Sequence, residues 1–590
     1  MSHATDNKRL TGGEFLFRET KPEDIFIPED FDEEQLMIAA ACQNFVEQRV
    51  MPVISRIDAA EAGLIGSLIK EAGELGLPAI SISEEYGGFG KDLVTSMLVG
   101  EKTGPTGSFS IAFMVHTGVG TLPILYYGNE EQKQKYLPKL ATGQLIGAYC
   151  LTEPGAGSDA NAGKTKATLS SDGKCYHLNG QKIWITNAGF ADLFIVFAKI
   201  ENDKNLSAFI VEKSFPGISL SPEEQKMGLK GSSTRQVFFN DCEVPVGNLL
   251  SGRDKGFKIA LNTLNTGRLK LGAVALGYAK SVITNAVRFA NEREQFARSI
   301  SKYGAVNKKL AEQAIHAYAT ESAIYRVSQN IEDAVQELIA AGMGASEAKL
   351  KGAESFAVEA AIIKVYATEA LDFIVDEGVQ IYGGMGYSAE APMERAYRDS
   401  RVYRIFEGTN EINRLLIVEL MLKRNTQGRS EPNEAANKGQ AESREPEDLF
   451  GKERIYIANF KKAILSVSKA AIQKYASRLV QEQEIVMCLA DMLIDTYVSE
   501  SFRLRVEKLA GRGGDDSIRE QIDMMQVYIR DAGDRIFKAG KEALNAFATG
   551  EEHAKLITKL KGYTETEAIN TTEARRRIAA KLIEKNQYCY

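Results

Sequence analysis

The stretch ESFAVEAAIIKVYATEALDFIVDEGVQIYG, residues 354–383, indicates the fold class more clearly than any other part of the sequence. Its apolar residues recur at three- and four-residue spacing, which is the pattern of a long amphipathic helix. The segment KLAEQAIHAYATESAIYRVSQNI, residues 309–331, has the same pattern. Because the links between such segments are short, residues 251–424 are predicted to form a bundle of antiparallel helices.

The sequence before this bundle has a different pattern of residue types. Short runs rich in β-branched and aromatic residues follow Tyr149, among them CYHLNGQKIWIT at 175–186 and TRQVFFND at 234–241. Turn pairs such as Asn179-Gly180 separate these runs. Residues 149–250 are therefore predicted to form a small antiparallel β domain.

Segments whose apolar residues have helical spacing also flank these two regions. Residues 30–148 are predicted to be an N-terminal helical domain, punctuated by the turn Tyr86-Gly87-Gly88. Residues 425–450 are polar and nearly free of aliphatic side chains, which is typical of a linker. Residues 451–590 are helical again. The predicted fold class is mainly α with a central β domain.

One internal echo connects the bundle with the C-terminal helical region. Leu310-Ala311, Tyr318, Glu321-Ser322 and Arg326 recur, each 179 positions later, as Leu489-Ala490, Tyr497, Glu500-Ser501 and Arg505. A helix repeated by an old duplication would produce this echo. Chance similarity between two amphipathic helices would produce it equally well, so both interpretations stay open.

Composition excludes several classes of function. The 590 residues are 44% hydrophobic and 26% charged, which is ordinary for a globular chain of several domains. The formal net charge of −7 argues against a general nucleic-acid binder. Six cysteines without a CxxC pair, and five histidines without an HExxH-like pair, argue against a disulfide framework and a metal site. The N-terminus MSHATDNKRLTGGEF resembles neither a signal peptide nor a transit peptide, and no apolar run approaches the length needed to span a bilayer.

Two glycine-rich stretches, Gly155–Ala160 and Gly384–Ala389, satisfy the loose GxGxxG/A pattern. The first is followed by strand-like sequence and the second follows a helix, so neither has the strand–turn–helix context of a Rossmann unit. Either loop can still present backbone N–H groups to a phosphate or a carbonyl. Tight turns alone also explain each stretch.

Glu407 and Trp184 each allow two interpretations. Arg398–Thr409 packs three arginines and two acids into twelve residues, which reads most simply as an ion-paired helix end stopped by Gly408. Alternatively, Glu407 lies in an apolar pocket beside Phe406, where desolvation raises its pKa and suits it to proton transfer. Trp184, the only tryptophan, sits on a predicted strand, where a tryptophan is more often core than ligand contact.

Taken together, six long motifs resemble those of acyl-CoA dehydrogenases. They are, in order, YCLTEPGAGSDA (149–160), GQKIWITNA (180–188), MGLKGSSTRQVFFNDCEVP (227–245), NEREQFARSI (291–300), QIYGGMGYSAEAPMERAYRDSR (380–401) and FEGTNEI (406–412). The resemblance covers roughly residues 35–420, and the extra domain after 450 is similar to that of the very-long-chain branch. It implies N-terminal helices, a β-barrel-like middle domain and a four-helix bundle, followed by the extra helical domain.

The resemblance also implies a reaction. A glutamate, here Glu407, removes the α-proton of an acyl-CoA thioester while the β-hydride passes to bound FAD. The family's flavin ribityl hydroxyl and the glutamate backbone N–H polarise the thioester carbonyl, where charge develops. Implied partners are the acyl-CoA substrate, electron-transfer flavoprotein as acceptor, and a second copy of the chain in a homodimer; no nucleic acid is expected.

Further site residues carry over from the motifs. The flavin is lined by Tyr149, Leu151, Thr152, Ser158, Trp184 and Thr186. The adenosine and pyrophosphate of FAD are held across a subunit interface by Arg293, Gln295, Phe296, Gln380, Gly383 and Gly384. Thr409 and Glu411 also contact that end of FAD. The acyl-CoA contacts are Ser158, Asn265, Arg268 and Gly408.

Three positions depart from the family pattern. Asn265 stands where many members have Asp, and Ala297 replaces a usual Gly, which predicts a tighter packed turn after Phe296. In some members the base lies just before the residue that corresponds to Arg268. That position is Gly267 here and cannot serve, which favours Glu407 as the base.

Two other functions remain as alternatives. An acyl-CoA oxidase shares the first half-reaction but uses O₂, and a catalytically silent assembly factor shares the scaffold. Residues 106–121 are expected to line the acyl channel, where Phe109, Phe113 and Met114 could narrow it. These residues leave the chain-length preference open.

The start of the C-terminal domain carries a possible membrane-binding helix. Within Lys452–Arg478 an apolar stripe is decorated by basic residues, a pattern that suits an anionic membrane surface. Docking of the same stripe inside the protein is the somewhat favoured alternative. A bacterial cytoplasmic location, with peripheral membrane contact through residues 451–480, is expected; the mitochondrial matrix is less favoured. The stripe consists of Ile455, Ile457, Phe460, Ile464 and Val467, and the basic residues are Lys461, Lys462, Lys469, Lys474 and Arg478.

Overall fold

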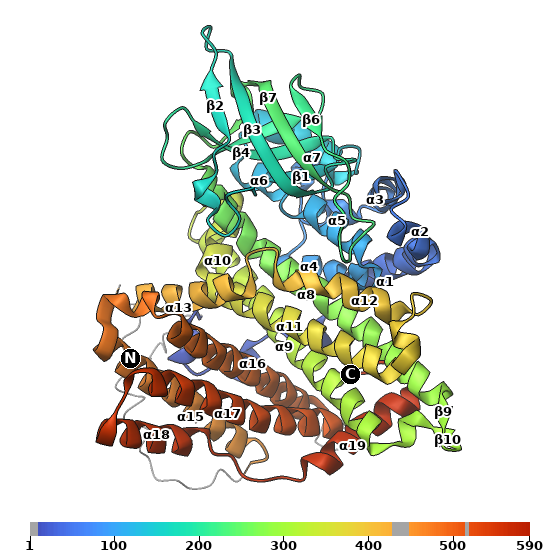
Figure 1. The fold of residues 1–590 in the computed structure, drawn as a ribbon, viewed down its shortest axis with the longest axis vertical. Coiled ribbons are helices and arrows are strands. Elements are labelled where there is room, and N and C mark those ends of the chain that lie inside the picture. Colours follow the sequence, from blue (N-terminus) through green and yellow to red (C-terminus); the bar gives the residue numbers. More distant parts are fainter. Residues whose placement is uncertain (1–9, 427–447, 514–517) are drawn as a thin grey trace.

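A computed structural model describes residues 10–426, 448–513 and 518–590. Most of the linker predicted at 425–450 therefore lies outside the described residues. Figure 1 shows a β domain at one end of the molecule, N-terminal helices beside it, and a large body of long helices below. This arrangement confirms the predicted fold class, mainly α with a central β domain.

The N-terminal helices pack beside the β domain and against the helical body. Asp32 caps the first helix, because its carboxylate accepts a hydrogen bond of 2.7 Å from the backbone N–H of Gln35. The helices are α1 (Glu33–Phe45), α2 (Ile54–Asp58), α3 (Leu64–Glu74), α4 (Leu93–Thr103), α5 (Ser108–Thr117), α6 (Leu122–Tyr127) and α7 (Glu130–Ala141).

The stretch Ser108–Tyr127 corrects the prediction that no apolar run is long enough to span a bilayer. In the described part of the chain it is the one stretch long and apolar enough to cross a membrane, judged by length and composition. It is broken between α5 and α6, and 94% of it is buried inside the protein. It therefore forms core in this structure.

The β domain is a mixed sheet rather than the antiparallel one predicted. Its strand order is β6-β7-β3-β2-β4-β5-β8, and β1 also pairs with β4. The pairs β1–β4 and β2–β4 are parallel, and the other pairs are antiparallel. The strands are β1 (Gly147–Cys150), β2 (Lys166–Leu169), β3 (Cys175–Thr186), β4 (Leu193–Ile200), β5 (Ser207–Glu212), β6 (Ile218–Leu220), β7 (Thr234–Pro245) and β8 (Leu249–Leu250).

Four long helices build the bundle that follows. These are α8 (Gly256–Glu292), α9 (Gly304–Ala340), α11 (Ala357–Tyr382) and α13 (Asn410–Thr426). The core runs through them without a break, because α8 and α11 are buried over most of their length. Shorter elements connect them: β9 (Glu294–Gln295), β10 (Arg298–Ser299), α10 (Ala345–Ser355) and α12 (Pro392–Ser400).

The C-terminal domain packs on this bundle through α16 and α19. Its helices are α15 (Gly451–Tyr475), α16 (Gln483–Gly513), α17 (Arg519–Phe547), α18 (Gly550–Thr564) and α19 (Thr571–Lys585). The apolar stripe of α15 faces inward. Ile457, Phe460, Ile464 and Val467 are at most 3% exposed, and Ile455 alone is 45% exposed. The stripe therefore docks inside the protein.

The echoing helices α9 and α16 contact each other through the residues that echo. Arg326 of α9 donates to the Glu500 carboxylate of α16 at 2.8 Å. In return, Arg505 of α16 donates to the Glu321 carboxylate of α9 at 2.8 Å. All four side chains are buried.

The aromatic and hydroxyl residues of the echo repeat this exchange. The Arg326 guanidinium lies 4.8 Å from the ring centre of Tyr497, and that of Arg505 lies 3.9 Å from the ring centre of Tyr318. Arg326 also donates to the Ser501 hydroxyl at 3.0 Å. Chance similarity does not require echoing residues to meet their counterparts, so this reciprocity favours the repeat.

Candidate active site

Glu407 lies in a strained turn between the short helix Arg401–Arg404 and α13. Its backbone φ is +56° and that of Gly408 is +81°. For a residue with a side chain this left-handed conformation costs roughly 1–3 kcal/mol, and it persists only where neighbours hold it. Here Lys364 Nζ donates to the Gly408 carbonyl at 2.7 Å, and Asn413 Nδ2 donates to it at 2.8 Å.

The Glu407 carboxyl group lies directly over α8. A Cβ atom placed on Gly267 would sit 2.9 Å from Glu407 Oε2, so a side chain at this position would displace the Glu407 carboxyl group. Oε2 is buried and has no hydrogen-bond partner among the described residues. Burial raises the pKa of Glu407 to about 7, although Arg268 and Lys364 partly offset it. This carboxyl group exchanges its proton near neutral pH, as a general base requires.

Arg268 and Asn265 lie on α8 next to this turn. Both are buried in α8, and Arg268 donates to the Asn265 side-chain oxygen at 2.8 Å. A longer contact of 3.4 Å joins Arg268 Nε to the backbone carbonyl of Glu407. Burial lowers the pKa of Arg268 to about 10, so it still carries its charge near neutral pH. Two of the predicted acyl-CoA contacts thus lie next to the predicted base.

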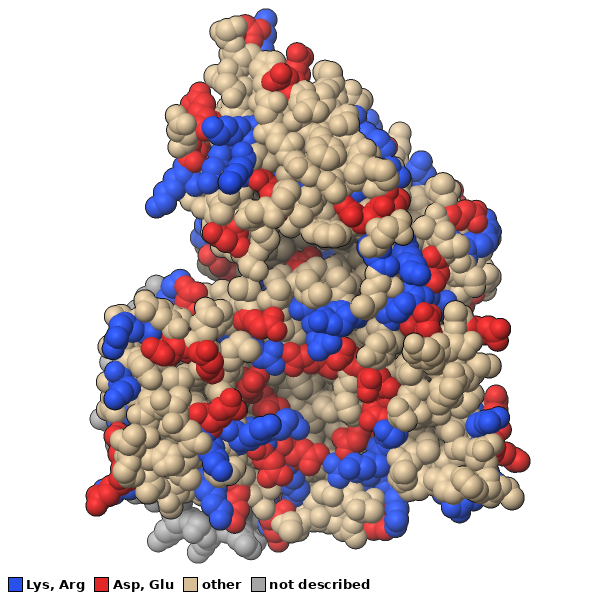
Figure 2. All heavy atoms as spheres, in the orientation of Figure 1, with Lys and Arg blue, Asp and Glu red and all other residues tan. Residues whose placement is uncertain are grey.

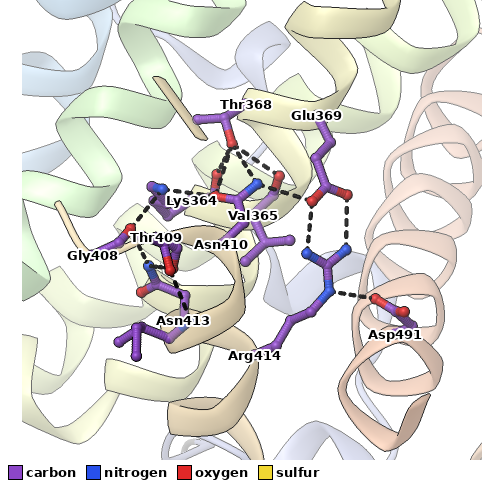
Figure 3. Close-up of polar contacts among 11 residues, drawn as sticks. Lys364, Val365, Thr368, Glu369, Gly408, Thr409, Asn410, Asn413, Arg414 and Asp491 are labelled. Carbon is purple, nitrogen blue, oxygen red and sulfur yellow. Dashed lines mark hydrogen bonds and ion pairs between the residues drawn. The ribbon is translucent and has the colours of Figure 1, made fainter. Parts of the chain in front are cut away.

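A polar network extends from the Glu407 turn to the C-terminal domain (Figure 3). Lys364 Nζ donates to Asn410 Oδ1 at 2.7 Å, and Asn410 Nδ2 donates to Glu369 at 2.9 Å. Glu369 holds Arg414 through two hydrogen bonds of 2.7 and 2.8 Å. Arg414 also donates to Asp491 of α16 at 2.7 Å. The network ties the Glu407 turn to α11, α13 and α16.

Lys364, Asn410 and Asn413 are site residues that were not predicted from the sequence. Burial and the positive charge of Arg268 lower the pKa of Lys364 to about 7, while the Glu407 charge raises it. A signal was available, since Lys364 is the single charged residue between Ala360 and Thr368 in an apolar helix. A lone lysine there requires a buried polar partner.

At the α13 N-terminus, Thr409 and Glu411 lie where a helix favours anions. The Thr409 hydroxyl accepts a hydrogen bond of 3.3 Å from the Ile412 N–H. The backbone N–H of Glu411 and the Thr409 hydroxyl lower the pKa of the Glu411 carboxyl group. Glu411 therefore already satisfies part of the hydrogen-bonding capacity of this helix terminus.

The residues predicted to line a flavin cluster at the end of β1 and the end of β3. Tyr149 lies close enough to Glu407 for that charge to help raise its pKa, although burial is the larger cause. The Ile183 N–H donates to the Thr152 carbonyl at 3.0 Å, which joins the segment Leu151–Glu153 to the strand of Trp184 and Thr186. A buried ion pair of 2.7 Å between Lys182 and Glu153 supports this junction.

Trp184 does not belong to the core. It is 56% exposed, with φ +59° at an irregularity in the β3–β7 pairing. The interpretation of Trp184 as a core residue is therefore wrong. Nearby, a Cβ atom at Gly155 or Gly157 would meet nothing within 4 Å, and Ser158 is exposed. Figure 2 shows a notch between the β domain and the helical body.

A second group of predicted residues lies far from Glu407. The helix α8 rises about 37 Å between Gly267 and Glu292, at 1.5 Å per residue. The Phe289 and Tyr382 rings stack at 4.0 Å, which brings the ends of α8 and α11 together. All members of the group are exposed: Arg293, Gln295, Phe296, Gln380, Gly383 and Gly384.

The turn after Phe296 is exposed rather than tightly packed. Phe296 is 90% exposed, and Phe296 and Ala297 both have left-handed φ values, +53° and +60°. The tighter packing predicted for Ala297 is therefore absent within this chain. Separately, no three His, Cys, Asp or Glu side chains in the described ranges lie close enough together to hold a metal ion.

Comparisons with known proteins agree with this geometry. Residues 32–144, 148–242 and 254–422 match the acyl-CoA dehydrogenase N-terminal, middle and C-terminal domains, and residues 459–562 match a further acyl-CoA dehydrogenase C-terminal domain. The chain is 41% identical over 583 residues to a probable acyl-CoA dehydrogenase of Bacillus subtilis, covering 98% of each chain. A match to the very long-chain specific acyl-CoA dehydrogenase of Rattus norvegicus is 40% identical over 353 residues and covers 58% of this chain and 51% of that protein.

A solved structure extends the likeness to the whole chain. The acyl-CoA dehydrogenase of Bacillus anthracis, complexed with FAD, superposes with a TM-score of 0.96 at 41% identity, covering 98% of this chain and all of that one. The matched N-terminal, middle and C-terminal domains define the class as acyl-CoA dehydrogenases. This chain belongs to the acyl-CoA dehydrogenase family.

Proposed function

We propose that this chain is an FAD-dependent dehydrogenase that converts an acyl-CoA thioester to its trans-2-enoyl-CoA. The observation that carries the proposal is Glu407, a buried carboxylate with an unpartnered oxygen and a pKa raised to about 7 by burial. It lies over Gly267, where no rival base can stand. FAD, when bound, would accept the β-hydride.

The residues of this chain would handle the proton and the thioester. Glu407, deprotonated, takes the α-proton. Its backbone N–H polarises the thioester carbonyl, as the family resemblance implies. Lys364 and Asn413 fix the turn through the Gly408 carbonyl, so little reorganisation accompanies the reaction. Arg268 stabilises the ionised carboxylate, because its positive charge lowers the pKa of Glu407.

The residues present fit FAD. The glycine loop at Gly155–Gly157 has open space for a ligand, and the exposed Trp184 ring offers a flat apolar surface. The buried Tyr149 hydroxyl has no partner among the described residues. The exposed set around Arg293 and Gly384 lies too far along α8 to reach a flavin beside Glu407. A homodimer, in which that set serves the partner's FAD, accounts for the separation.

The acceptor is proposed to be electron-transfer flavoprotein, and the pathway β-oxidation of fatty acids, in particular long-chain ones. Trp184 supports this, since its exposed ring would let an acceptor protein approach the flavin.

The test is anaerobic titration of the purified protein with acyl-CoA thioesters of increasing length, followed by admission of air. Bleaching of the flavin with slow reoxidation is expected. Rapid reoxidation by O₂ would indicate an oxidase, and no bleaching with any thioester a silent scaffold.

Peripheral membrane contact in a bacterial cytoplasm is the remaining proposal. With the α15 stripe docked and Lys461 paired to Glu500 at 2.5 Å, only the outer basic residues remain to support it. These are Lys462, Lys469, Lys474 and Arg478, with Ile472 and Val480 exposed among them. Binding to anionic vesicles should weaken with salt, because the Debye length is about 8 Å at physiological ionic strength. Intact protein left in the supernatant after low-salt vesicle sedimentation would contradict this proposal.

A further inference from the structure

A small cavity lies between α4, α5 and α8 in the segment expected to line the acyl channel. Its volume is about 20 Å³, room for one or two atoms. Phe113 and Val274 supply apolar wall, as an alkyl chain requires. Leu77, Ile80, Val99 and Met114 extend this apolar wall, and polar residues interrupt it, among them Ser96, Thr103, Thr117 and Lys270.

The cavity is in line with the catalytic carboxylate. Gly267, Lys270 and Val274 are spaced by three and four residues on α8, so they share one face of that helix. Glu407 lies over Gly267. At 1.5 Å per residue, Lys270 and Val274 lie about 4.5 and 10.5 Å further along the helix axis. An acyl group with its α-carbon at Glu407 that follows this face reaches Lys270 and then the cavity.

Lys270 is a buried cation without a counter-charge. Lys270 is 6% exposed, and its Nζ donates to the Thr117 carbonyl at 3.1 Å and to the Thr117 hydroxyl at 3.4 Å. In the described part of the chain no carboxylate forms an ion pair with it. Burial lowers the pKa of Lys270 to about 8, so it is still largely charged at neutral pH. A buried ammonium group gains most from an anion.

We propose that Lys270 determines specificity at the far end of the acyl group, by binding a terminal carboxylate of ω-carboxyacyl-CoA substrates. The inference rests on the proposed dehydrogenation and adds its substrate class. A plain alkyl chain of the same length leaves the Lys270 charge against methylene groups, which disfavours it.

The competing role for Lys270 is purely structural. Thr117 is the last residue of α5, and a lysine near a helix C-terminus stabilises the free carbonyl groups there. A capping lysine would affect every substrate alike. The discriminating quantity is therefore the ratio of kcat/KM for an ω-carboxyacyl-CoA to kcat/KM for the alkanoyl-CoA with the same number of carbons.

The experiment compares this ratio in wild-type holoenzyme, Lys270→Met and Lys270→Arg over a series of chain lengths. At lengths that reach the cavity, Lys270→Met should lower the ratio about tenfold or more, as expected for loss of one charge-assisted hydrogen bond. Lys270→Arg, which keeps the charge, should retain most of the wild-type ratio.

An unchanged ratio in Lys270→Met, or an equal loss for both thioesters, would overturn the specificity role. Binding of the same thioester pairs to Glu407→Gln holoenzyme, with and without Lys270→Met, provides a second readout independent of turnover. If no acyl-CoA bleaches the wild-type flavin, the proposed function itself fails. If both thioesters bleach it with a ratio insensitive to Lys270, only this inference fails.

Discussion

The surroundings of Glu407 disfavour its charged form, and this gives the reaction a pH dependence. Burial raises the pKa of the carboxyl group to about 7. Because the base acts when deprotonated, flavin reduction by acyl-CoA should speed up as pH rises through about 7 and level off above it. Stopped-flow reduction over a pH series measures this. A rate that is flat between about pH 5 and 8 would contradict the raised pKa.

The same shift affects stability. A carboxyl group with a folded-state pKa raised from 4.5 to about 7 favours folding below its unfolded pKa, and this advantage is lost as pH rises through 7. Glu407→Gln removes the ionisation. The variant should therefore gain stability relative to wild type at about pH 8, by up to about 3 kcal/mol, and little at about pH 4. Denaturant unfolding of the two holoproteins at both pH values tests the sign.

Lys364 should act on the reaction through Glu407. Its positive charge lowers the pKa of Glu407, and its ammonium group holds the Gly408 carbonyl. Lys364→Met should move the pH profile of flavin reduction to higher pH and slow reduction at pH 7 by roughly tenfold, the scale of one hydrogen bond to a charged group. Lys364→Arg is the matched control, since it keeps the charge. A slower rate with an unmoved profile would leave Lys364 a structural role only.

At the scale of single residues, the sequence predicted Glu407 as the base but not the residues that hold its turn in place. The glycine at position 267 already excluded the alternative base position in the sequence. The structure is consistent with this, because a side chain there would meet Glu407. Lys364 and Asn413 were missed because they act on a backbone carbonyl. That contact depends on the path of the turn after Phe406, which no local residue pattern specifies.

At the scale of elements, the reciprocal contacts of α9 and α16 hold the C-terminal domain on the bundle. Lys461 and Arg326 lower the pKa of the buried Glu500 to about 2. Glu500→Gln leaves Arg326 buried without its anion, which should cost about 3–5 kcal/mol. Hydrogen exchange of α9 and α16 amides reports the local loss.

The exposed pair Glu347–Lys351 is the control for this variant. Its side chains are 61% and 50% exposed, so Glu347→Gln should change stability by no more than about 0.5 kcal/mol. Because a lowered carboxylate pKa stabilises the fold above its unfolded pKa, the effect of Glu500→Gln should shrink as pH falls from about 4.5 towards 2. Equal exchange rates in Glu500→Gln and wild type would show that the pair does not hold the domain.

Periodicity predicted the elements better than their pairings. The β domain at 149–250 was recognised, but the parallel pairing of β4 with β1 and β2 was not, since it depends on contacts distant in sequence. The stripe of α15 was recognised as amphipathic. Periodicity gives the apolar face of a helix but not what covers it, and here other helices of the protein do.

For the whole molecule, the distance between the two groups of predicted FAD residues is the informative feature. If a partner's Arg293 serves each FAD, Arg293→Ala should lose FAD through loss of a charge-assisted contact, most readily when dilution dissociates the dimer. Mixing Arg293→Ala with Glu407→Gln subunits should then restore activity. One site of each mixed dimer would have both residues intact, which gives roughly a quarter of wild-type activity in an equal mixture. Mixtures no more active than the separate variants would place Arg293 outside a shared site.

The central claim, that Glu407 is the base, is tested most directly by single-turnover flavin reduction in Glu407→Gln under anaerobic conditions. The substitution keeps the shape of the side chain and removes the basic carboxylate. We predict wild-type FAD content and acyl-CoA affinity, with the reduction rate lowered by about 10²-fold or more, the scale of a lost general base. Reduction at a near wild-type rate would contradict the account and require another residue to take the α-proton.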